Sequence, residues 1–73
     1  MKVSQLIYNF DNERYTLDNE DLYCGDTLKV LVYNGLTNET EWINTRLEIN
    51  SSGEWYLVGL AGYSIGGLFA ARG

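Results

Sequence analysis

The 73-residue sequence predicts an all-β fold, either a small SH3-like barrel or a strongly bent antiparallel sheet of about five to seven short strands. Three observations lead to this prediction. Several segments alternate apolar and polar residues, turn-forming residues separate these segments, and no segment sustains the period of a helix. Because the chain is short and has no proline-rich or repetitive stretch, we expect residues 1–73 to form one small β-barrel domain.

The first two expected strands form a hairpin. Residues Val3–Phe10 alternate, so that Leu6, Tyr8 and Phe10 share one face, which is typical of a half-buried strand. After a short polar break, Arg14–Leu17 returns to residue types that favour strands. The next residues, 18–21, are polar and acidic and are expected to form a loop.

The clearest strand pattern follows a turn signal at Gly25-Asp26. A strand is expected from Thr27 to Val32 or Tyr33, with its apolar alternate residues facing inward: Leu28, Val30 and Val32. We expect Asp26 to accept a hydrogen bond within the turn, and the thiol of Cys24 to be a buried or half-buried packing group.

A break over residues 34–41 is expected to be too long for a tight hairpin. The strand Trp42–Ile49 then alternates again. Its inward set is Ile43, Thr45, Leu47 and Ile49, and its outward set includes Trp42 and Arg46.

The segment Asn50–Gly53 is the cleanest turn signal, with Gly53 suited to a positive φ. The following segment, Glu54–Leu60, is nearly continuous in apolar residues and is expected to be covered on both faces. Closure of a barrel would protect its edge. A last short strand is expected at Leu68–Ala71, after several glycines.

A candidate binding site lies on the second half of the chain. Pairing Ile49 with Glu54, to within one residue, places Trp55 on the outer face beside Arg46 and Glu48. Flat rings next to guanidinium groups stack on nucleobases or on apolar protein surfaces. The candidate ligand-binding residues are Trp42, Arg46, Trp55, Tyr56, Tyr63 and Arg72. The alternative is that these rings cover a small core.

Composition restricts the possible functions. With 10 acidic and 5 basic residues, the net charge of -5 opposes general binding to nucleic acids. The chain has no histidine and a single cysteine, so we expect a cytoplasmic protein without catalytic residues, metal or cofactor. No apolar run is long enough to span a membrane. A hydrolase that uses Asp21 and Asp26 remains a minor alternative.

Five segments carry a resemblance to a known family: Tyr23–Asp26, Leu28–Val30, Trp42 with Thr45–Glu48, Trp55–Leu60 and Gly67–Arg72. In these segments the chain resembles a family of small uncharacterised domains from bacterial mobile elements and phages. The departure from its pattern is a longer loop, Tyr33–Glu41. The resemblance implies no established activity.

The sequence therefore favours a non-enzymatic binding protein. The setting implied by the resemblance suggests a homo-oligomeric accessory factor of a phage or mobile element that counters host defence by sequestering a nucleotide-like ligand. The alternative is an acidic protein-interaction module that inhibits a host protein by occupying its basic surface, since residues 11–26 carry six carboxylates.

Overall fold

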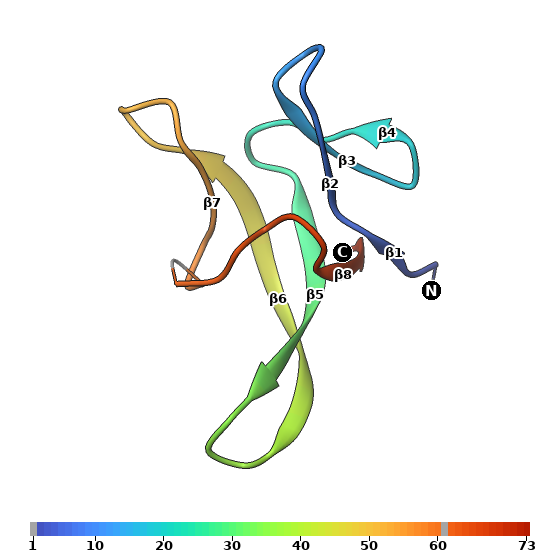
Figure 1. The fold of residues 1–73 in the computed structure, drawn as a ribbon, viewed down its shortest axis with the longest axis vertical. Coiled ribbons are helices and arrows are strands. Elements are labelled where there is room, and N and C mark those ends of the chain that lie inside the picture. Colours follow the sequence, from blue (N-terminus) through green and yellow to red (C-terminus); the bar gives the residue numbers. More distant parts are fainter. Residues whose placement is uncertain (1, 61) are drawn as a thin grey trace.

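The computed structural model, which describes residues 2–60 and 62–73, is all-β, and these residues contain no helix. The eight strands form two antiparallel sheets (Figure 1). Their bounds are β1 Ser4–Gln5, β2 Ile7–Asn9, β3 Arg14–Leu17, β4 Glu20–Asp21, β5 Thr27–Asn34, β6 Glu39–Ile49, β7 Trp55–Leu57 and β8 Phe69–Arg72. The predicted all-β class is confirmed, with more strands than expected because the first expected strand is divided into β1 and β2 and the expected acidic loop contains β4.

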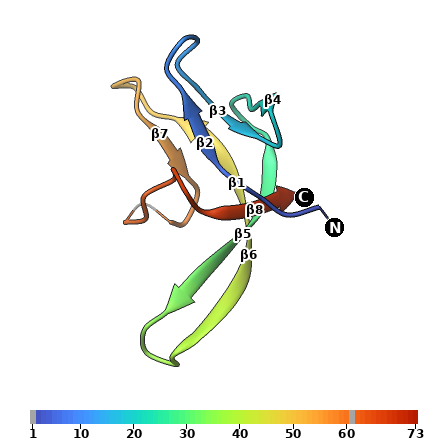
Figure 2. The ribbon, with the colours of Figure 1, turned by 45° about the vertical axis from the view of Figure 1, so that its right-hand side comes forward.

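The larger sheet has the strand order β1-β8-β5-β6-β7, and the smaller sheet has the order β2-β3-β4. Pairing of β1 with β8 brings the two ends of the chain close together (Figure 2). The sheet is strongly bent, and β1 and β7 remain at its edges. The expected protection of the β7 edge by closure is therefore wrong, and β7 is instead kept very short.

The expected first strand, Val3–Phe10, is divided at Leu6 between the two sheets. The Leu6 N–H donates to the Leu68 carbonyl at 2.8 Å, and the Leu6 carbonyl accepts from the Gly67 N–H at 2.8 Å. The Leu6 side chain is fully buried. Phe10 lies beyond the end of β2 and is 83% exposed, so its predicted place on the buried face is wrong.

The acidic segment 18–21 is not entirely a loop, because Glu20–Asp21 forms β4. Leu17 pairs with Glu20 across a two-residue turn, in which Asp18 and Asn19 have φ values of +54° and +64°. Two successive positive φ values are typical of the type I′ turn, which Asp and Asn tolerate best among residues other than glycine.

The turn before β5 is confirmed. The Asp26 N–H donates to the Tyr23 carbonyl at 3.0 Å, and the Asp26 carboxylate accepts from the Tyr23 N–H at 2.8 Å. Gly25 has a φ of +95°, which glycine adopts without strain. The three inward residues of β5, Leu28, Val30 and Val32, are at most 3% exposed.

The β5–β6 hairpin is longer than expected, because β5 continues to Asn34 and β6 begins at Glu39. The expected long loop, residues 34–41, is reduced to residues 35–38. The prediction against a tight hairpin is therefore wrong. The end of this hairpin extends away from the body of the molecule (Figure 1), and Leu36 in its loop is 98% exposed.

The predicted packing role of Cys24 is also wrong. Cys24 is exposed, and its thiol donates to Oε1 of Glu48 at 3.2 Å. The turn at Gly25 places the cysteine outside the core, while its neighbour Leu22 is fully buried.

The β6–β7 hairpin has the expected turn, with Gly53 at a φ of +80°, but its register differs by one residue. Ile49 pairs with Trp55 instead of Glu54, and Leu47 pairs with Leu57. Because successive side chains point to opposite faces, this one-residue difference exchanges the faces of Trp55 and Tyr56. The strand is three residues long and Tyr56 is exposed, so the expected coverage of both faces of Glu54–Leu60 is wrong.

The core lies between the two sheets and is aliphatic. Its fully buried members include Leu6, Leu22, Leu47, Val30 and Ala70. Of the expected inward set on β6, Leu47 is buried, Ile43 and Thr45 are half-buried, and Ile49 at the strand end is 41% exposed. The last strand, Phe69–Arg72, begins one residue later than predicted.

Candidate functional site

The larger sheet has one face toward the core and one face toward solvent, which we call the outer face. On β5, the residues that alternate with the buried set are Thr27, Lys29, Leu31 and Tyr33, and these point outward. The register of β6 adds the residues opposite them, which are Arg46, Asn44, Trp42 and Thr40. Phe69 of β8 continues the row of Leu31 and Trp42.

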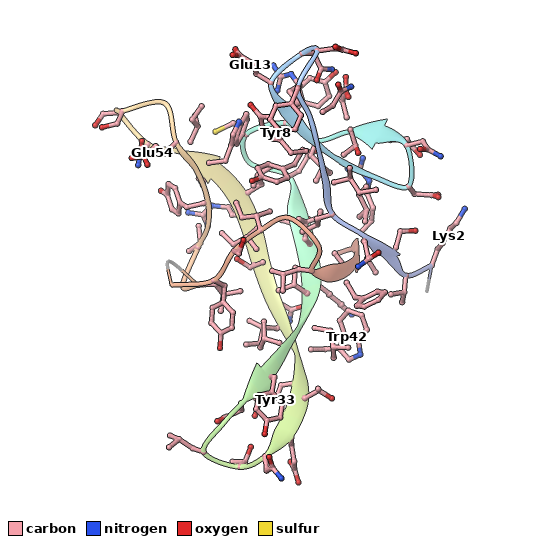
Figure 3. The ribbon with its side chains drawn as sticks, in the orientation of Figure 1. Lys2, Tyr8, Glu13, Tyr33, Trp42 and Glu54 are labelled. Atoms are coloured by element: carbon pink, nitrogen blue, oxygen red, sulfur yellow. The ribbon has the colours of Figure 1, made fainter. Side chains whose placement is uncertain are left out.

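Three of the six predicted site residues lie on the outer face. Trp42 and Arg46 occupy alternate positions of β6, and Tyr56 of β7 lies opposite Glu48. Trp42 is 42% exposed and Tyr56 is 37% exposed. Figure 3 shows Trp42 and Tyr33 along the β5–β6 hairpin, away from the end of the molecule that carries Tyr8 and Glu13.

Trp55 does not join this group. It is half-buried, packs against the core, and its indole N–H donates to the Glu13 carbonyl at 3.2 Å. The ring therefore connects β7 to the hairpin of β2 and β3. The position of the Trp55 indole thus agrees with the alternative interpretation, in which the aromatic rings cover a small core.

Arg72 and Tyr63 lie elsewhere. Arg72 pairs in register with the inward residue Leu28, and its guanidinium lies 3.4 Å from the Asp26 carboxylate. Tyr63 is 43% exposed in the connection between β7 and β8. In the glycine-rich connection the Gly67 N–H already donates to a backbone carbonyl, so this amide is not available to a phosphate.

A groove of about 480 Å³ crosses the outer face from Gly73, which follows β8, to Val58, which follows β7. Its outward lining residues are Thr27, Lys29, Asn44, Arg46, Val58 and Gly73. Two cations, Lys29 and Arg46, therefore line the same groove as the uncharged side chains of Thr27, Asn44 and Val58.

The charge at this groove is opposite to that of the whole chain. Lys29 and Arg46 supply two positive charges, and Glu48 is the one carboxylate that we find among the outward residues of β5 to β8 in the described part of the chain. Arg46 donates through Nε to Oε2 of Glu48 at 2.8 Å. That bond leaves the two terminal nitrogens of the guanidinium able to donate to a ligand.

Glu48 accepts two hydrogen bonds at once. The Cys24 thiol and the Arg46 guanidinium both stabilise its ionised form, and together they lower the pKa of Glu48 below its ordinary value. The carboxylate is therefore ionised at neutral pH and holds the guanidinium in place on β6.

Lys29 was not among the predicted site residues. The register places it opposite Asn44, which makes it a diagonal neighbour of both Trp42 and Arg46. Its outward direction could be read from the alternation of β5, but its neighbours depend on the pairing of β5 with β6. No ion pair holds Lys29 among the described residues.

The described residues contain no group of three or more Cys, Asp and Glu side chains that could hold a metal ion. Of the two carboxylates in the hydrolase alternative, Asp21 accepts from the Asn12 amide at 3.0 Å, and Asp26 is used by its turn and by Arg72. Each carboxylate therefore has a local partner that orients it.

Comparison with known proteins identifies one family. The family model described as "Domain of unknown function (DUF5348)" matches residues 4–68. No curated protein matches the chain, and no solved structure matches it. Over the described residues, no helix is long and apolar enough to cross a membrane.

Proposed function

We propose that this chain, which belongs to the DUF5348 family of domains of unknown function, is a non-enzymatic binding protein that captures a nucleotide-like ligand on its outer face. The observation that carries the proposal is the position of Lys29, next to both Trp42 and Arg46 on one exposed face. An aromatic ring and two cations together match a ligand with a flat ring and an anionic group.

The spacing along β6 supports a small ligand. Trp42, Asn44 and Arg46 are successive outward residues, and outward positions on one strand are separated by roughly 7 Å. A base stacked on Trp42 thus has its first phosphate close to Lys29, which lies opposite Asn44, whereas Arg46 is two steps from Trp42, roughly 14 Å, and suits a more distant phosphate. The groove, which is lined by Lys29 and Arg46 but not by Trp42, would hold the anionic part of the ligand; its volume of about 480 Å³ lies within the range of small-molecule sites, about 300–1,000 Å³.

We extend the proposal to the setting of the protein. The motif pattern that resembles mobile-element and phage domains supports an accessory factor that acts in the cytoplasm and sequesters a nucleotide signal of host defence. We also propose a homo-oligomer whose interface covers Phe69 of β8, which is 49% exposed, and leaves Trp42 free for the ligand. Size-exclusion chromatography with light scattering tests the oligomer, and a chain that stays monomeric at high concentration contradicts it.

The ligand is tested by thermal shift and by amide chemical-shift mapping. The panel contains nucleoside monophosphates, cyclic dinucleotides, the corresponding nucleosides and inorganic phosphate. A bound ligand raises the melting temperature by mass action, and it should perturb the amides of Lys29, Asn44 and Arg46. The absence of both effects for every panel member at millimolar concentration contradicts the proposal.

Three variants identify the contacts. Lys29→Gln and Arg46→Gln should each weaken binding of a phosphorylated ligand about tenfold, because a charge-assisted hydrogen bond is lost. Trp42→Ala should weaken the binding of nucleotides but not the binding of inorganic phosphate. The matched control is Lys2→Gln, which removes a cation that is 75% exposed and paired with Asp18 outside the groove. An equal loss in the control means that only net charge acts.

A further inference from the structure

The smaller sheet has an uncovered face of its own. Ile7, Thr16 and Asp21 lie side by side across β2, β3 and β4. The alternate residues Tyr8, Tyr15 and Leu17 point the other way, where Leu17 is buried in the core and Tyr15 packs against it. The face that carries Ile7, Thr16 and Asp21 is therefore directed to solvent, and we call it the small-sheet face.

Two large apolar side chains are exposed beside this face: Ile7 points outward from β2, and Phe10 follows the end of the strand, on the side of Tyr8. Ile7 is 61% exposed and Phe10 is 83% exposed. The Phe10 ring meets the Tyr8 ring edge to face, with their centroids 4.8 Å apart, and Tyr8 in turn meets Tyr15 at 5.0 Å. Phe10 is thus held in an exposed position by a ring that is itself packed, which is favourable for docking because little side-chain entropy remains to be lost.

A groove of about 390 Å³ runs along the same face. It is lined by Ile7, Tyr8, Asn9, Phe10, Asp11, Thr16, Asn19 and Asp21. The Asn12 amide donates to Oδ2 of Asp21 at 3.0 Å, so the Asp21 carboxylate has a fixed direction while its other oxygen makes no hydrogen bond among the described residues.

The charge of this groove defines the partner. Two carboxylates, Asp11 and Asp21, line it, and no lysine or arginine does. Arg14 lies on the same face, opposite Asn9, but forms no ion pair with either carboxylate among the described residues; its guanidinium lies over the Tyr23 ring at 4.5 Å and donates to the Leu22 carbonyl. Lys2 is likewise occupied by Asp18 at 2.7 Å. The groove therefore presents uncompensated negative charge next to exposed apolar side chains.

We propose that the small-sheet face docks a basic segment of a partner protein, in which a lysine or arginine enters between Asp11 and Asp21 and an apolar side chain packs on Ile7 and Phe10. Charge complementarity selects this occupant. A second copy of the chain would bring the same acidic face, and phosphate-rich surfaces are repelled by it. The small-sheet face lies at the opposite end of the molecule from Trp42 and Tyr33, as the positions of Tyr8 and Glu13 in Figure 3 show. The proposal is therefore independent of the ligand proposed for the outer face.

The experiment uses the full chain, labelled with ¹⁵N, and short synthetic peptides as probes. One peptide combines lysine and leucine, a second replaces leucine by serine, and a third replaces lysine by glutamate. The lysine–leucine peptide should perturb the amides of Ile7, Phe10, Thr16 and Asp21. The serine peptide should bind about tenfold more weakly, and the glutamate peptide should not bind.

Charge-matched variants separate a docking site from general attraction to an acidic protein. Asp11→Asn combined with Asp21→Asn should lower the affinity for the lysine–leucine peptide by about tenfold, and Phe10→Ser should lower this affinity by a similar factor. The control Glu39→Gln combined with Glu41→Gln removes two carboxylates from the β5–β6 hairpin and should leave the affinity unchanged. Circular dichroism spectra verify that each variant remains folded.

Three results overturn the proposal. The first is perturbation confined to residues outside the small-sheet face, or none at millimolar peptide. The second is equal binding of the serine and leucine peptides, which means that the apolar side chains contribute nothing. The third is an equal loss in the Glu39 and Glu41 control, which means that only the net charge of the chain attracts the peptide.

Discussion

The carboxylate of Asp26 is expected to stabilise this fold through two contacts. Its Oδ2 atom accepts from the Tyr23 N–H at 2.8 Å and lies 3.4 Å from Nη1 of Arg72. The first contact closes the turn that starts β5, and the second connects that turn to β8. Asp26→Ala removes both contacts, whereas Asp26→Asn keeps an oxygen that can accept from Tyr23 and removes only the charge.

The two contacts differ in magnitude. A hydrogen bond from a backbone N–H to a carboxylate contributes about 1.5 kcal/mol at the lower end of its range, and we use this end because the turn is solvent-accessible. The ion pair is worth about 0.5 kcal/mol or less, because the two side chains are 28% and 48% exposed and solvent screens them. Asp26→Ala should therefore cost about 2 kcal/mol, and Asp26→Asn about 0.5 kcal/mol.

Thermal denaturation followed by circular dichroism measures these costs. In a domain of this size about 1 kcal/mol corresponds to a change of roughly 4–8 °C, so Asp26→Ala should melt roughly 10 °C lower than the parent chain. Added salt should reduce the small deficit of Asp26→Asn and leave the gap between the two variants unchanged. Asp11→Ala is the matched control, because the Asp11 side chain accepts no hydrogen bond among the described residues. Equal melting temperatures of Asp26→Ala and Asp26→Asn would refute the reasoning, because the turn hydrogen bond would then contribute nothing.

Two further predictions concern the β6–β7 hairpin. Trp55→Ala should destabilise the chain by about 2 kcal/mol, because the half-buried indole packs on the core and donates to the Glu13 carbonyl. Trp42→Ala should cost less than about 1 kcal/mol, because its side chain is 42% exposed. Chemical denaturation measures both costs, and a larger cost for Trp42→Ala contradicts the register of β7. Glu48→Gln should lower the melting temperature at neutral pH, because the pKa of Glu48 is held below its ordinary value of 4.5 by Cys24 and Arg46. A lowered pKa contributes stability above the unfolded pKa, so the difference between parent and variant should vanish as the pH falls through the folded pKa; a difference that persists in strong acid contradicts this origin.

Much of the local structure could be predicted from the sequence. The turn at Gly25-Asp26, the inward set Leu28, Val30 and Val32, and the strand Arg14–Leu17 are all observed. Each depends on residues that are neighbours in the chain, where turn chemistry and period-two alternation apply directly. Trp42 and Arg46 also point outward as predicted, because the alternation of β6 continues without interruption.

The errors have a different origin. The break of the first strand at Leu6 depends on hydrogen bonds to Gly67 and Leu68, more than sixty residues away, as the sequence numbers show. The hydrogen bond of the exposed Cys24 thiol depends on Glu48 of another strand. Neither partner leaves a signal in the local pattern.

The sequence by itself determined that the chain is all-β, where most turns lie, and which faces of its two long strands are apolar, because these properties follow from alternation and from residue-specific φ preferences. Only the tertiary structure decided which aromatic and cationic side chains share a surface. A shift of one residue in the pairing of β6 with β7 moves Trp55 to the core and Tyr56 to solvent, and the pairing of β5 with β6 brings Lys29 between Trp42 and Arg46. The physical reason is that strand register is set by contacts between segments, and each step of register exchanges the two faces of a strand.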